Sequence, residues 1–265
     1  MKYMLPGMAL IFIAPAALAQ DASSNDGSLS AKQYVIDLGV GAMYEPKYPG
    51  ADEYQVYPFP LIRFSRFYVP ILDTSIDGDA AKSGFSIYPS FDFNGKRNSS
   101  DSAELKGTRD VDWALELGLG VSYQYDWMRG FVELRQGING HTGQVADFGI
   151  DMITNPTERL GIVFGPRLSW GSNDYMDTYF GVTAAEAAVN GSVLSPYDAG
   201  SGFKSFGMAA RANYGLTDNT TLHLQAGWDR LIGDAADSPI AEVGSENQLS
   251  IGAGISYKFA FDIFE

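Results

Sequence analysis

The stretch WALELGLGVSYQY, residues 113–125, alternates between two kinds of side chain along its whole length. Counting from Trp113, every second residue is a large apolar or aromatic one, whereas the residues between them are Ala, Glu, Gly, Gly, Ser and Gln. This two-residue period predicts a β-strand with one apolar and one polar face. Aromatic residues stand at both ends of the apolar face, and Leu and Val fill its middle. A strand that crosses a bilayer has this arrangement, because acyl chains meet its centre and headgroups meet its ends.

The same alternation recurs along most of the chain. It is regular over 34–42, 159–170 and 248–261, and less regular over 55–64, 84–93, 130–138, 144–154, 203–214 and 220–231. Strands of about ten residues, apolar on one face and polar or Gly-rich on the other, are typical of transmembrane barrels. The sequence therefore predicts an all-β fold, an antiparallel transmembrane β-barrel, with a secreted β-sandwich as the alternative.

The number of strands follows from the connections. Short connections are predicted at 65–66, 126–129, 155–158 and 216–219, and long ones at 94–111, 171–202 and 232–247. A short strand at 67–72 brings the count to ten or eleven, and a weak strand hidden between 71 and 82 would give the even number that such barrels carry. The estimate is about twelve. The long outer loop at 171–202 contains TAAEAAVNG, in which Thr183 can cap a short helix.

Composition and the N-terminus indicate where the protein resides. Residues 1–19 have the layout of a signal peptide, 20–33 form a polar periplasmic tail, and 34–265 form the barrel, which predicts export to the bacterial outer membrane. The formal charge of −14 argues against a nucleic-acid partner, because phosphate binding needs a basic face. The chain has no Cys, so disulfides contribute nothing to its stability.

The phase of the strands assigns residues to the two faces of the wall. Charged and polar residues predicted to line the lumen are Glu116, Glu133, Arg135, Arg167, Arg211, His223 and Asp229. They would set ion selectivity in an open channel, or the arginines would pair with the acids and plug the barrel. Aromatic residues predicted to form girdles at the bilayer interfaces are Trp113, Tyr123, Tyr125, Trp127, Trp170, Trp228 and Tyr257.

Catalysis and metal binding find little support in the residues. The two histidines are the only candidate general bases of neutral pH, and we expect His141 to be a solvated turn residue and His223 to point into the lumen. The acidic run Asp229, Asp234, Asp237 and Glu242 lacks the spacing of a calcium loop and is expected to be a solvated outer loop. We predict no enzyme activity, no catalytic residue, no cofactor and no metal site.

Four stretches carry a resemblance to a known family. They are YPGADEYQVYPFPLIRF at 48–64, GPRLSW with DYMDTYFGVTAAEAA at 165–188, SPYDAGSGF at 195–203, and above all DRLIGDAADSPI at 229–240. With them the chain resembles the MltA-interacting protein (MipA)/OmpV family of outer-membrane proteins over essentially its whole mature length. The resemblance implies a barrel in contact with outer-membrane lipid, and no catalytic residues carry over from the family.

Two functions stay open at this point. Some members of that family resemble scaffolds that join a murein transglycosylase to a penicillin-binding synthase in the periplasm, and this is the expected function. Others act as porins or host-contact proteins. The alternative expectation is a narrow porin for small solutes, motivated by the polar, glycine-rich inner face.

Overall fold

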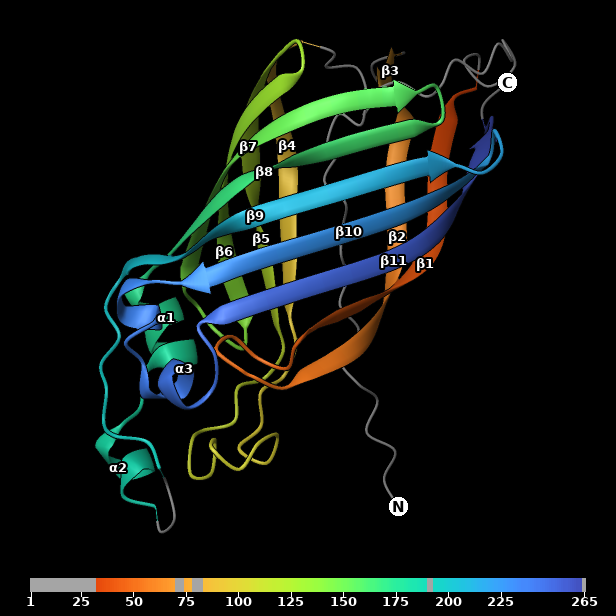
Figure 1. Ribbon diagram of the computed structural model, residues 1–265. Coiled ribbons are helices and arrows are strands. Elements are labelled where there is room, and N and C mark those ends of the chain that lie inside the picture. The colour runs from red at the N-terminus through yellow and green to blue at the C-terminus, as the bar shows by residue number, and fades with distance from the viewer. Residues whose placement is uncertain (1–31, 70–73, 78–82, 190–192, 264–265) are drawn as a thin grey trace, which may run out of the picture.

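The computed structural model describes residues 32–69, 74–77, 83–189 and 193–263, with the backbone alone at 64–69 and 74–77. The predicted signal peptide and almost all of the predicted tail lie outside these residues. In the described part, one antiparallel sheet curls into a barrel (Figure 1). Its strands are β1 (Tyr34–Pro46), β2 (Tyr54–Val69), β3 (Thr74–Asp77), β4 (Gly84–Asn94), β5 (Ala114–Tyr125), β6 (Met128–Asn139), β7 (Gln144–Thr157), β8 (Leu160–Gly171), β9 (Gly202–Gly215), β10 (Thr220–Leu231) and β11 (Asn247–Phe261).

Neighbouring strands in the sheet are also neighbours in sequence, apart from one pairing. The order is β3-β2-β1-β11-β10-β9-β8-β7-β6-β5-β4, so the first long strand pairs with the last, with Tyr34 opposite Phe261 and Tyr44 opposite Ile251. In the described residues, β3 and β4 are the two edge strands. The long hairpins and the pairing of β1 with β11 confirm the predicted antiparallel barrel.

The predicted long strands are confirmed, but the prediction of a short connection at 65–66 is wrong. Strand β2 continues from Tyr54 to Val69, so the stretch beginning at 67 is part of it and not a separate strand. The cause is a β-bulge: Val35 pairs with Arg66 and Ile36 pairs with Phe64, which leaves Ser65 as the extra residue. A bulge interrupts the two-residue alternation in the same way as a turn does. Strand β3 lies within the range where the hidden strand is predicted, and the described residues hold eleven strands.

Burial in the wall is inverted relative to a water-soluble sheet. On β5, Glu116 is 1% exposed whereas Leu119 is 62% exposed and Tyr123 is 58% exposed. Outward apolar and inward polar side chains alternate along the whole strand. Such a surface is stable only against lipid, because water would penalise the exposed apolar side chains.

Glycines on the inner face make room for large side chains that lie against the wall. A Cβ at Gly120 would stand 2.4 Å from the ring of Tyr88, and one at Gly149 would stand 2.4 Å from the ring of Phe131. No side chain fits at either position without displacing a ring. The inner glycines therefore serve packing of the interior as well as curvature of the wall.

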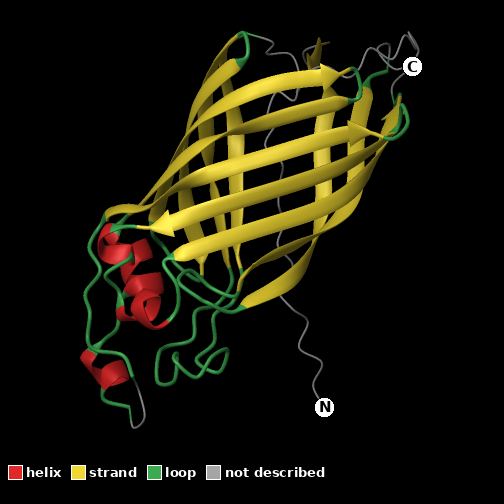
Figure 2. Cartoon of the chain, viewed as in Figure 1, coloured by secondary structure: helices red, strands yellow, loops and turns green. Residues whose placement is uncertain are grey.

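The two ends of the barrel differ (Figure 2). One end carries short turns at 126–127, 158–159 and 216–219. The other end carries the long loops, together with helices α1 (Asn173–Phe180), α2 (Ala184–Ala187), η1 (Gly233–Ala235) and α3 (Pro239–Val243). We call the described residues of the loops at 95–113, 172–201 and 232–246 the cap. None of the helices among the described residues has the length and apolar character needed to cross a membrane.

Helix α2 is the helix that the sequence predicts. Thr183 is its N-cap, and Thr183 and Glu186 form a reciprocal capping box. The longer helix α1 and helix α3 are not anticipated by the sequence, because their residues carry no helical period strong enough to distinguish them from loop.

Candidate functional site

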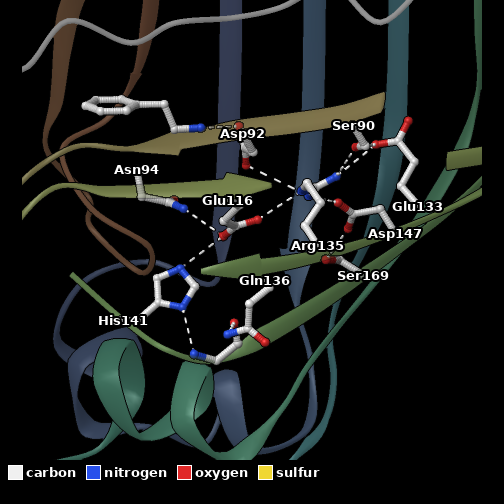
Figure 3. A network of polar contacts seen from close by, with 12 residues as sticks. Ser90, Asp92, Asn94, Glu116, Glu133, Arg135, Gln136, His141, Asp147 and Ser169 are labelled. Carbon is white, nitrogen blue, oxygen red and sulfur yellow. Dashed lines mark hydrogen bonds and ion pairs between the residues drawn. The ribbon is translucent and has the colours of Figure 1, made fainter. Parts of the chain in front are cut away.

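The interior of the barrel near the cap contains a cluster of charged side chains centred on Arg135 of β6 (Figure 3). The Arg135 Nε donates to Glu116 Oε2 at 3.0 Å, and its Nη1 donates to Glu133 Oε2 at 2.8 Å. Its Nη2 forms an ion pair with Asp147 and lies 3.9 Å from Asp92. One guanidinium thus contacts carboxylates from four neighbouring strands.

Neutral groups complete this Arg135 cluster. Ser90 on β4 donates to Glu133 at 2.7 Å, Ser169 on β8 donates to Asp147 at 2.5 Å, and Asn94 donates to Glu116 at 2.8 Å. The cluster therefore ties β4, β5, β6, β7 and β8 together. Its four carboxylates and single guanidinium leave a formal charge of −3, so the interior near the cap is acidic.

His141 connects the Arg135 cluster to the cap. Its side chain is fully buried, and its Nε2 lies 3.2 Å from Glu116 Oε1, in a direction unfavourable for a hydrogen bond. Its Nδ1 accepts a hydrogen bond from the backbone N–H of Gly143 at 3.2 Å, which assigns the ring proton to Nε2 in the neutral form. The ring meets Tyr175 and Tyr179 of α1 edge-on, with centroids 5.1 and 5.5 Å away.

The prediction that His141 is solvated is therefore wrong. The turn that carries it folds inward, and helix α1 covers the ring with two tyrosines. A turn motif indicates a change of chain direction but not whether a distant loop will pack over it, which is why the sequence misleads here.

The cap has a hydrophobic core of its own. One buried cluster joins Tyr175, Met176, Tyr179 and Phe180 of α1 to residues of η1, α3 and the ends of β7 and β10. A second joins Leu105, Val182, Leu194 and Ile240 to the loop between β1 and β2. Of the acids predicted to be solvated, Asp234, Asp237 and Glu242 are exposed and Asp229 is half-buried. The apolar residues Ala235, Ile240 and Ala241 of the same loop are buried in this packing.

Four backbone carbonyls at the C-terminal end of α1 all receive donors. Arg97, which is 1% exposed, donates to the carbonyls of Tyr179 at 2.7 Å and Thr178 at 3.2 Å. Arg109 donates to the carbonyl of Asp177. The remaining donor is the Ser238 hydroxyl, which bonds the carbonyl of Phe180 at 2.6 Å. These bonds satisfy the orphan acceptors of a helix terminus, and the two guanidinium groups complement the negative end of the helix dipole.

Electrostatics support this placement of the arginine. Burial, together with the nearby Arg109, lowers the pKa of Arg97 to about 10, so the side chain remains charged at neutral pH. The pKa of Glu186 lies below its ordinary value: burial raises it, but hydrogen bonds from Thr183 and the backbone of Arg109 outweigh that effect. Both charged groups therefore fasten the loop at 95–113 to the helical loop.

A second charged cluster lies deeper, toward the short turns. Asp151 is fully buried and binds two arginines, Arg129 and Arg167, the latter at 2.5 Å. The guanidinium groups of the same two arginines lie 5.7 and 5.0 Å from the ring centroid of Phe131. Arg211 faces this region, and no ion pair joins it to a carboxylate among the described residues.

His223 stands between two possible partners of a hydrolytic site. Its Nδ1 lies 2.8 Å from Asn213 Oδ1 and its Nε2 lies 2.7 Å from Ser256 Oγ. This geometry matches a Ser-His-Asn arrangement, but Ser256 is 4% exposed and the adjoining cavity measures about 20 Å³. A cavity of that size holds a single water molecule and no substrate.

The structure places the predicted lumen residues in different environments. Glu116, Glu133 and Arg135 come together, as the plugged alternative requires. Arg167 pairs instead with Asp151, His223 bonds Asn213 and Ser256, and neither Arg211 nor Asp229 forms an ion pair within the described part of the chain. The sequence missed Asp92, Arg97, Arg129, Asp147 and Asp151. The strand phase of 144–154 could have assigned Asp147 and Asp151 to the inner face, whereas Arg97 carries no such signal.

The predicted girdle residues divide between the two ends of the wall. Strand direction puts Trp113, Trp170 and Trp228 near the cap end, and Tyr123, Tyr125, Trp127 and Tyr257 near the short-turn end. Their exposure reaches 71% at Tyr125 and 56% at Trp127, while Trp170 and Trp228 are half-buried. Their contact with bilayer interfaces stays a prediction.

The family model described as MltA-interacting protein MipA matches residues 38–259. Outer membrane protein Omp26La of Vibrio anguillarum is 34% identical over 159 residues, covering 58% of this chain and 55% of the relative. Outer membrane protein OmpV of Vibrio cholerae is 35% identical over 159 residues, with the same coverage. The chain thus spans about half the length of these curated relatives.

Two solved outer-membrane structures are distant matches to this chain. An outer membrane channel from Pseudomonas putida F1 matches with a TM-score of 0.42 and 11% identity over 86% of this chain and 96% of that chain. The outer membrane protein OprG from Pseudomonas aeruginosa matches with a TM-score of 0.26 and 12% identity over 86% and 97%.

Proposed function

This chain belongs to the MltA-interacting protein MipA family of outer-membrane β-barrels, and from that premise we propose that it is an occluded barrel serving as a periplasmic docking platform. Its partners in this proposal are a murein transglycosylase of the MltA type and a penicillin-binding synthase. The family description names the first partner. The second comes from the resemblance in the sequence.

The observation that carries the proposal is the closely packed interior. Several inward side chains on strands around the barrel are almost inaccessible to water: Leu61 on β2 is 3% exposed, Glu116 on β5 is 1%, Asp151 on β7 is 0% and Ser256 on β11 is 4%. In a water-filled channel such groups would border solvent. The cap closes the same barrel from one end with its own hydrophobic core. A packed interior favours a structural role over free passage of solutes.

The docking surface in this proposal is the short-turn end. Arg159 and Asp218 are 49% and 74% exposed there and form an ion pair at 3.4 Å. The beginning and the end of the described chain meet at this rim, where Lys32 pairs with Asp262 at 2.7 Å. That contact holds Lys32, at the C-terminal end of the predicted tail (residues 20–33), beside the turns. Three short turns alone offer little area for a stable interface. In this proposal the tail therefore also contacts the partner enzymes.

The proposal includes no catalytic step. The Ser256, His223 and Asn213 arrangement lies in the packed interior, beside a cavity of about 20 Å³ that holds no substrate.

A pull-down with the folded, detergent-solubilised barrel tests the proposal. We expect it to retain a purified MltA-type transglycosylase and a penicillin-binding synthase. Removal of residues 20–31, or the double change Arg159→Ala/Asp218→Ala, is expected to reduce retention, whereas Glu186→Gln in the cap leaves it unchanged. Recovery of neither enzyme by a barrel whose heat-modifiable gel migration shows folding would refute the docking function.

A narrow channel is the second candidate, favoured by the water-accessible cavity of about 320 Å³ at the cap end. Single-channel recording in a planar bilayer separates the two. The packed interior predicts a silent bilayer. Steady openings whose ion preference shifts in Arg135→Glu/Arg167→Glu would establish a lumen pathway and refute the occluded interior.

A further inference from the structure

The guanidinium of Arg211 on β9 lies in the interior without a counter-charge in contact. The side chain is half-buried, yet it makes neither an ion pair nor a hydrogen bond within the described part of the chain. Asp151 attracts it, but both oxygens of that carboxylate are already bound, Oδ2 by Arg129 and Oδ1 by Arg167. A charge removed from water is stable only with a compensating charge beside it, and the described residues offer Arg211 none.

The charges near Arg211 do not balance. Three arginines and one aspartate share this part of the interior: Arg129, Arg167, Arg211 and Asp151. Three guanidinium groups against one carboxylate give a formal charge of +2. Glu133, the second acid that acts on Arg211, is bound to Arg135. Asp37 on β1 stands opposite Arg63 on β2, so these two residues together add no net charge.

A cavity of about 20 Å³ adjoins this guanidinium. Four polar side chains of β9 and β10 line it: Arg211, Asn213, His223 and Gln225. Phe59 and Leu61 of β2, which are 5% and 3% exposed, line the cavity as well. A Cβ at Gly254 would stand 2.7 Å from Leu61 Cδ1, so this glycine makes room for the leucine. Among the described residues that line the cavity there is no carboxylate, and a guanidinium faces it.

The cavity also holds hydrogen-bond donors that no described residue accepts. His223 Nδ1 lies 2.8 Å from Asn213 Oδ1, and its Nε2 lies 2.7 Å from Ser256 Oγ. Because a carboxamide oxygen only accepts, the neutral ring donates from Nδ1 and accepts the serine hydroxyl at Nε2. The Asn213 Nδ2 amide thus keeps its donors, and so does Arg211 in the same cavity wall. None of these nitrogens is among the buried polar atoms sealed from water, so a small solute can reach them.

We propose that this cavity binds a small inorganic anion of the size of chloride. Arg211 supplies the counter-charge and N–H donors, and Asn213 Nδ2 supplies a further donor. A water molecule needs about 10–15 Å³ of such space, so a cavity of about 20 Å³ accommodates a slightly larger monatomic ion. A tetrahedral oxyanion such as sulfate is too large for it. The site does not depend on the docking function, because it lies inside the wall and not at the exposed rim.

Chloride NMR on the folded mature chain in detergent tests the site. A bound chloride ion relaxes quickly and broadens the signal of the free ion with which it exchanges. We expect broadening that saturates as sodium chloride is raised and that bromide removes, whereas sulfate at the same ionic strength leaves it in place. Absence of saturable broadening, or equal displacement by sulfate, would overturn the proposal.

Variants separate this site from general attraction to surface cations. Arg211→Met is expected to weaken chloride binding by about tenfold or more, because it removes the charge and its donors. Arg159→Met is the matched control: it removes the same charge at the exposed rim and is expected to leave the affinity unchanged. Equal affinities in these two variants, with folding confirmed by gel migration, would overturn the proposal.

A second variant tests the site if Arg211→Met fails to fold. Asn213→Asp keeps the side-chain shape and places a carboxylate in the wall beside Arg211, where it competes with an anion from solution. We expect it to abolish the saturable broadening. Chloride binding that persists unchanged in the folded Asn213→Asp barrel would contradict a site at Arg211.

Discussion

Replacing Arg135 by Met tests whether the charged cluster holds the wall together. The guanidinium is 6% exposed at its side chain and its partner Glu116 is 2% exposed, so the change leaves a buried carboxylate without its cation. Breaking a buried pair in this way costs about 3–5 kcal/mol. Glu133 and Asp147 are 17% and 28% exposed and regain some hydration. Glu116 also keeps its hydrogen bond from Asn94. We therefore expect a loss of about 3 kcal/mol, the lower end of that range.

Reversible urea unfolding of the barrel in lipid vesicles measures this free energy directly. The double variant Arg135→Met/Glu116→Gln removes the orphaned charge together with its partner, and we expect it to recover about 1–3 kcal/mol relative to the single change. The recovery distinguishes an electrostatic loss from a packing defect, because the cavity left by the arginine is the same in both variants.

Arg159→Met is the matched control for removal of an arginine. It breaks an exposed pair with Asp218 and is expected to cost less than about 1 kcal/mol. A loss from Arg135→Met no larger than that from Arg159→Met, or a double variant as unstable as the single one, would refute the reasoning.

Three further predictions concern the wall, the cap and the closed interior. Leu119→Arg places a cation on the exposed middle of β5 and is expected to cost about 2–4 kcal/mol in vesicle unfolding, while Thr217→Arg in a short turn changes stability little; equal effects would contradict a lipid-facing wall. Because the pKa of Glu186 is depressed, its carboxylate stabilises α2 at neutral pH, and Glu186→Gln is expected to speed amide exchange there. The difference from the unmodified chain is expected to fade as pH falls below 4.5. A difference that does not depend on pH would exclude a charge effect. A fluorophosphonate probe is expected to leave Ser256 unlabelled in the folded barrel, and labelling that Ser256→Ala abolishes would reveal a hydrolase.

Much of the wall was predictable because the sequence pattern is local. The side-chain period of two is set by the strand itself, and the bilayer requires one apolar face, so residues 113–125 reveal both strand and orientation. Thr183 predicts helix α2 for a similar reason, since an N-cap acts on the first turn of the helix that follows it. The bulge at Ser65 was misread because a single extra residue and a tight turn disrupt the period alike.

The candidate site depended on contacts between distant parts of the chain. Strand phase aimed Glu116, Glu133 and Arg135 inward, and neighbouring strands then brought them together. Arg97 binds the C-terminus of α1, which lies more than 80 residues away in sequence, and no local pattern predicts that contact.

The sequence alone predicted a lipid-facing wall, because each strand must present its own apolar face to the bilayer. Only the tertiary structure decided that loops fold into a cap, that His141 is buried beneath it, and that Glu45 and Asp229 line a cavity at the cap end. Closure, burial and charge compensation are properties of the assembled set of side chains, and their free energies depend on distances that the chain acquires only when it folds.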